Sequence, residues 1–121
     1  MRYMFLVSGA ETSAPPPQAM IDEIERLTEE DFAAGRLLAR GGLLPPAMGA
    51  ARVESRGGKI KVTDGPFAET KEVLGGFAIY EFETREEALA SAQRFMDLHH
   101  EHWPAWDGVC EMRPMFGFEA R

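Results

Sequence analysis

The chain has a single cysteine, a shortage of basic residues and no long apolar run, and each of these excludes a class of protein. Cys110 is the one cysteine among 121 residues, so no disulfide can form within the chain, which suits a reducing compartment. The 13 lysines and arginines against 20 acidic residues give a formal charge of −7, which disfavours a nucleic-acid partner because a phosphate-binding face needs a basic patch. No segment approaches the roughly 18 apolar residues that cross a membrane, and the opening Met1–Val7 run is too short for a signal peptide. We therefore expect a cytoplasmic protein that binds neither nucleic acid nor a membrane.

Motifs for nucleotide cofactors and for nucleophilic hydrolysis are also missing. The glycine pairs Gly41-Gly42 and Gly75-Gly76 lack the spacing of dinucleotide or phosphate loops. No nucleophile elbow and no Ser-His-Asp arrangement is visible. We therefore expect no cofactor. A chain of this length, 45% hydrophobic and 27% charged, has the composition of one globular domain over residues 1–121.

Apolar periodicity and turn residues predict strands alternating with two helices. The apolar stripe of the first helix, residues 18–34, consists of Met20, Ile24, Leu27 and Ala34, and Gly35 is its expected end. The second helix, residues 85–101, should begin with a capping box of Thr84 and Glu87. Strands are expected at residues 3–7, 36–40, 77–82 and 111–118, with a hairpin of 51–55 and 59–63 turning at Gly57-Gly58.

This order predicts an α+β fold of the ferredoxin-like kind, an antiparallel sheet with two helices on one face. The other face of the sheet would then carry apolar side chains drawn from Phe5, Phe77, Ile79, Met112, Phe116 and Phe118. A second copy of the chain is the simplest cover for such a face. We therefore expect a homodimer with the two sheets packed against each other.

Residues 64–72 read Asp-Gly-Pro-Phe-Ala-Glu-Thr-Lys-Glu, and Leu-Gly-Gly-Phe follows at 74–77. This segment resembles the signature of the DGPF-domain branch of the YCII-related proteins, and the segments 1–4, 42–46 and 111–114 support the likeness. The resemblance implies a dimeric α/β barrel similar to muconolactone isomerases. It implies little about activity, because most members have no assigned reaction. Some members are encoded beside extracytoplasmic-function sigma factors, which implies a sigma-factor partner for part of the family.

The chain departs from this family at one functional position. The YciI-like branch is thought to use a histidine of the first helix, paired with an aspartate, as a catalytic dyad. Residues 18–34 contain no histidine here, so that dyad cannot be carried over.

The signature itself supplies one group of candidate site residues. Asp64 could act as a general base, or it could be a turn aspartate that accepts backbone N–H bonds. Lys71 lies between Glu69 and Glu72, so the three could orient an anionic substrate, or form a solvated surface ion pair. Together with Phe67 these side chains would line a cleft that binds a small polar or carboxylated molecule.

The histidines at the end of the second helix supply the other group. His99 and His102 share a helix face, a spacing that could ligate a metal if Asp64 supplied a third ligand. Histidines at a helix C-terminus also complement the helix dipole without any ligand. Only histidines normally titrate near neutrality, so His99 is the second catalytic candidate. Two functions stay open: a cofactor-free acid–base isomerase or lyase, and a regulatory module that docks a partner protein.

Overall fold

The computed structural model describes residues 1–10, 14–67 and 72–119. Its elements, in chain order, are β1 (Arg2–Gly9), α1 (Gln18–Ala33), β2 (Leu37–Gly42), β3 (Ala51–Arg56), β4 (Lys59–Asp64), β5 (Val73–Glu81), α2 (Arg85–His102) and β6 (Gly108–Pro114). The predicted α+β class and the predicted order of elements are confirmed. The last strand lies earlier than expected, because Gly108 already pairs with Gly9 and the strand ends at Pro114.

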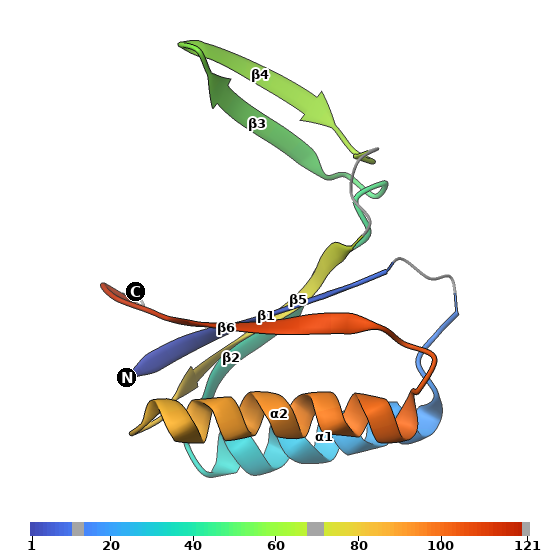
Figure 1. Cartoon of the computed structure of the whole chain (residues 1–121), viewed down its shortest axis with the longest axis vertical. Coiled ribbons are helices and arrows are strands. Elements are labelled where there is room, and N and C mark those ends of the chain that lie inside the picture. The colour runs from blue at the N-terminus through green and yellow to red at the C-terminus, as the bar shows by residue number, and fades with distance from the viewer. Residues whose placement is uncertain (11–13, 68–71, 120–121) are drawn as a thin grey trace.

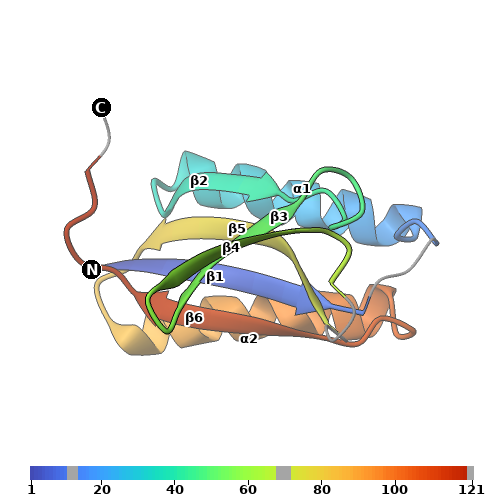
Figure 2. The same cartoon turned by 90° about the horizontal axis from the view of Figure 1, so that it is seen from above.

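The main sheet has four antiparallel strands in the order β2-β5-β1-β6, as a ferredoxin-like fold requires. Both helices cover one face of this sheet, and the β3–β4 hairpin extends over the other side as a separate two-stranded ribbon (Figures 1 and 2). β6 is an edge strand, a position in which its Pro114 is tolerated. Neither helix in the described ranges combines the length and apolarity that a membrane crossing takes.

Both helix ends that the sequence predicted are present. The N–H of Glu87 donates to Thr84 Oγ1 at 3.2 Å, which caps α2. Helix α1 is terminated by Gly35, which follows the C-cap Ala34 and has a φ of 75° that is unfavourable for residues with a side chain. There the N–H of Arg36 donates to the Asp31 carbonyl at 3.0 Å and that of Gly35 to the Phe32 carbonyl at 3.1 Å, the two bonds of a Schellman motif.

The core between sheet and helices is built on stacked aromatic rings. Phe5 lies 4.8 Å from Tyr80, and Tyr80 lies 5.3 Å from Phe82, measured between ring centroids. Met112 packs against the same cluster, which also contains two alanines of α2. The assignment of Phe5 and Met112 to the uncovered face was therefore wrong. The two residues are paired across β1 and β6, so their side chains lie on the same face of the sheet, the one that packs against the helices.

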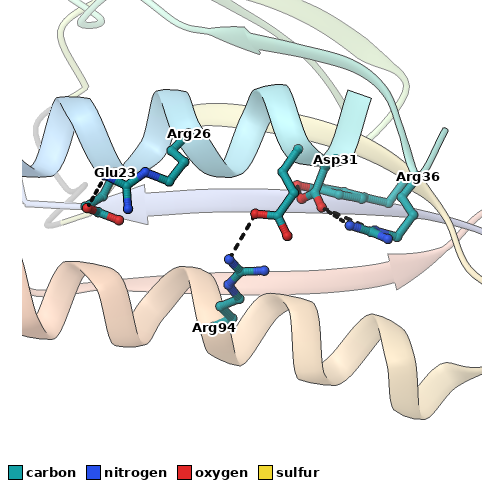
Figure 3. Close-up of polar contacts among 7 residues, drawn as sticks. Glu23, Arg26, Asp31, Arg36 and Arg94 are labelled. Carbon is teal, nitrogen blue, oxygen red and sulfur yellow. Dashed lines mark hydrogen bonds and ion pairs between the residues drawn. The ribbon is translucent and has the colours of Figure 1, made fainter. Parts of the chain in front are cut away.

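Asp31 is a buried carboxylate that the sequence did not reveal as such. Its residue is only 3% exposed, and its carboxylate accepts bonds from Arg36 Nη2 at 2.9 Å and from the Tyr80 hydroxyl at 2.9 Å. Figure 3 shows the Asp31–Arg36 pair beside the more exposed Glu30–Arg94 bridge, which links α1 to α2 at 3.3 Å. Burial, and then the negative charge of Asp31, raise the pKa of Tyr80.

The position of Asp31 explains why it is buried. The apolar stripe of α1 runs through positions 20, 24 and 27, and position 31 continues this series at helical spacing. An acidic residue in the middle of an apolar stripe is the signal that could have identified it.

Removing the buried carboxylate should destabilise the fold. We expect Asp31→Ala to lower the free energy of unfolding by about 3 kcal/mol, because Tyr80 and Arg36 both lose a charged acceptor. Glu30→Ala is the control, since this neighbouring carboxylate forms only an exposed ion pair and should cost below about 1 kcal/mol. Urea denaturation measures both values, and similar losses in the two variants would contradict a structural role for Asp31.

Candidate functional site

A cleft of about 560 Å³ opens where β1 ends and β5 begins. Its lining consists of Val7, Gly9, Ala10, Leu43, Leu44, Pro45, Val73, Leu74, Gly75, His99 and Trp106. These residues come from the ends of β1 and α2, the segments that follow β2 and α2, and the start of β5. Among the described residues of this lining, His99 is the one with an ionisable side chain. The volume lies in the range of small-molecule sites.

The imidazole of His99 is oriented by its own helix. Its Nδ1 lies 2.9 Å from the Phe95 carbonyl oxygen. Because a carbonyl oxygen can only accept, Nδ1 carries the proton, and Nε2 is left with a lone pair. Burial lowers the pKa of His99, and the bond to Phe95 opposes this shift only in part. The ring is therefore neutral at neutral pH, and Nε2 can accept a hydrogen bond or a proton.

Trp106 forms the wall beside this imidazole. Its ring centroid lies 4.4 Å from that of His99. The indole occupies a notch made by two glycines that pair across β1 and β6, Gly9 and Gly108. A Cβ atom at Gly108 would lie 2.2 Å from the indole and 2.5 Å from the backbone oxygen of Ser8. The position of Trp106 thus depends on the absence of side chains beneath it.

The residues predicted from the signature lie elsewhere or outside the described ranges. Asp64 is the last residue of β4 and is exposed, and its carboxylate makes no hydrogen bond to other residues that the structure describes. The ring of Phe67 lies 4.0 Å below the guanidinium of Arg52. Neither Asp64 nor Phe67 lines the cleft of His99. Glu72 is exposed just before β5, and Glu69 and Lys71 lie outside the described residues.

His102 is not part of the cleft lining either. Its Nε2 lies 3.8 Å from a carboxylate oxygen of Glu101, and its side chain is 24% exposed. Within residues 1–10, 14–67 and 72–119, no three His, Cys, Asp or Glu side chains lie close enough together to hold a metal ion.

The second part of the signature, residues 74–77, nevertheless contributes to the cleft. Leu74 and Gly75 line the cleft, and the Gly75 carbonyl accepts the N–H of Leu43 at 2.9 Å. This bond joins the start of β5 to the Leu43–Pro45 segment. Both of these parts of the cleft lining belong to segments that supported the family resemblance. The sequence drew attention to Asp64 because it is ionisable, whereas the part of the signature at the cleft is apolar.

A methyl group in the glycine notch should displace Trp106. We expect Gly108→Ala to change the near-ultraviolet circular dichroism of the tryptophans and to lower the free energy of unfolding by about 1–3 kcal/mol, as overpacking does. Gly42→Ala is the matched control, because a Cβ atom there meets its nearest neighbour at an ordinary 3.8 Å. An unchanged tryptophan spectrum in Gly108→Ala would show that the indole is not held in the notch.

Comparison with known proteins supplies a family. The sequence model of the YCII-related domain matches residues 1–98, which is most of the chain. The match runs from β1 into α2 and ends one residue before His99. None of the curated proteins matches the sequence. The signature, the α+β architecture and this match together show that the chain belongs to the YCII-related family.

Proposed function

We propose that the protein binds a small organic molecule in the His99 cleft and that Nε2 of His99 accepts a hydrogen bond or a proton from it. The observation that carries this proposal is a neutral imidazole whose Nδ1 is fixed by a backbone carbonyl and whose Nε2 has no partner among the described residues, in a cleft whose other described lining residues are mostly apolar. A ligand that fits must combine an apolar body with at least one polar hydrogen. Trp106 offers the apolar body a flat surface.

The chemistry open to such a site is proton transfer. Nε2 would take a proton from a carbon beside a carbonyl group and return it to another atom of the same molecule, an enol–keto isomerisation. One C–H bond is broken and one new bond to hydrogen is formed, so no cofactor is consumed. The lowered pKa of His99 supports this role, because the imidazole is then in its basic form at neutral pH.

The working molecule is proposed to be a homodimer. The hairpin carries an apolar face on which Val53 and Val62 are paired, and Val53, Ile60 and Val62 are 67%, 69% and 64% exposed. A two-stranded ribbon with one exposed apolar face is marginally stable alone. A second copy, seated between hairpin and sheet, would cover both this face and the uncovered face of the main sheet.

Nuclear magnetic resonance tests the proposed site directly. In a fragment library of small carbonyl compounds and carboxylates, we expect the hits to shift the imidazole signal of His99 and the indole N–H signal of Trp106. The signal of His100, which is exposed on the same helix, serves as the internal control. Hits that shift only signals outside the cleft would refute the assignment.

The buried imidazole should also make stability depend on pH. The pKa of His99 is lower in the folded protein than in the unfolded chain, where it is about 6.5. As the pH falls through that value, the unfolded chain takes up a proton that the folded protein does not, so stability is lost. Between pH 7.5 and 5.5, His99→Gln should therefore lose less free energy of unfolding than the parent. His100→Gln should keep the parent's dependence, and identical curves for all three proteins would contradict the burial of His99.

The dimer can be tested by sedimentation. At micromolar concentration we expect the parent to sediment as a dimer and Val53→Ser/Val62→Ser to shift toward monomer, because the apolar hairpin face is lost. Lys61→Ser changes the charged face of the same hairpin and should remain dimeric. A parent that sediments only as monomer would overturn the proposal.

A further inference from the structure

A second cavity of about 570 Å³ lies between the sheet and α1. Apolar residues from both helices and three strands dominate its lining, among them Phe5, Ile24, Leu27, Leu37 and Phe95. Its polar members are Thr28, Arg40 and Tyr80, and the hydroxyl of Tyr80 is already bonded to Asp31. Among its described lining residues, the exposed Arg40 is therefore the one cation beside a mainly apolar space.

Arg40, the cation of this cavity, lacks the carboxylate partner that several other described arginines have. Five other arginines form ion pairs with a carboxylate, namely Arg26, Arg36, Arg56, Arg94 and Arg113. Arg40 instead donates from Nη1 to the neutral Oγ1 of Thr28 at 3.0 Å. No carboxylate in the part of the chain that the structure describes pairs with it. Its remaining N–H donors can therefore bind an anion with the fork geometry of a guanidinium.

The second cavity adjoins the His99 cleft. Val7 and Gly75 line both spaces. Phe95 lines the second cavity, and its ring centroid lies 4.6 Å from that of His99. A ligand that fills the second cavity can thus extend past Phe95 toward the imidazole.

We infer that the two spaces together bind an amphipathic monocarboxylate, with its carboxylate on Arg40, its apolar chain or ring in the second cavity and its far end at His99. This inference rests on the proposed function and names its substrate class. The guanidinium supplies a bidentate partner for a carboxylate. The apolar walls select an uncharged body, and an imidazole at the other end selects a polar hydrogen there.

Calorimetric titration with octanoate and octan-1-ol tests the carboxylate contact. We expect octanoate to bind the parent and to bind Arg40→Met about tenfold to a hundredfold more weakly, because a charge-assisted bond is lost while the apolar stem is kept. Octan-1-ol should bind both proteins within about twofold. Arg26→Met is the matched control, an exposed arginine of α1 that does not line the cavity, and should bind octanoate like the parent.

A chain-length series tests the apolar body. From butanoate to octanoate the affinity should rise about fourfold for each added CH2 group, as burial of a methylene predicts. At saturation octanoate should shift the imidazole signal of His99 in the parent. An affinity that is independent of chain length would place the carboxylate on the protein surface and overturn the inference.

Other outcomes separate this inference from the proposed function. Equal octanoate affinities in the parent and Arg40→Met would overturn the role of Arg40, while fragment hits at His99 would still support the first cleft. Octyl phosphate that binds more than tenfold tighter than octanoate, and only with Arg40 present, would replace the carboxylate by a phosphate monoester. The absence of any fragment shift at His99, with Arg40-dependent octanoate binding intact, would refute the proposed function and leave only an anion site at Arg40.

Discussion

The buried carboxylate of Asp31 joins three parts of the chain that apolar contacts alone would hold less specifically. It accepts bonds from Tyr80 in the sheet and from Arg36 in the turn that leads into β2, and it lies in the last turns of α1. A buried charge is tolerated only while its partners remain in place, so this site fixes the rotation of α1 about its own axis. The same rotation brings Leu27 and Thr28 to the wall of the second cavity. Thr28, the hydrogen-bond partner of Arg40, is thus positioned by the contacts of Asp31, about one helical turn away.

The buried carboxylate of Asp31 and the half-buried imidazole of His99 differ in how completely their hydrogen-bonding atoms are satisfied. Both oxygens of Asp31 accept hydrogen bonds, so the group is fully used in holding the fold. His99 has a fixed partner for one nitrogen only. An unused acceptor in an apolar lining costs free energy unless something approaches it, which is why His99, and not Asp31, is the group suited to a ligand. The carboxylate that stabilises the fold and the imidazole of the proposed site therefore lie at different ends of the helical layer.

The regular elements could be predicted from the sequence because their signals are local. Helical and strand periods, a capping box and a terminal glycine each depend on residues close together in the chain. The predictions that failed depend on the register between strands that are far apart in the chain. The sequence could not show that Gly9 and Gly108 pair beneath an indole, or that Phe5 faces the helices, since a shift of one residue reverses the face. Asp31 was overlooked for a related reason, because its partner Tyr80 lies 49 positions away.

The family match ends one residue before His99, so the apolar part of the cleft lies within the matched residues and its imidazole and indole lie beyond them. The matched part supplies the sheet, most of both helices and the anchor at Asp31. The remaining residues supply the imidazole, the indole beside it and the edge strand that supports them. The two aromatic side chains of the proposed site, His99 and Trp106, thus come from the short segment that follows the matched part. A substitution in the turn before the last strand would therefore alter the proposed site while leaving the sheet and the Asp31 anchor unchanged.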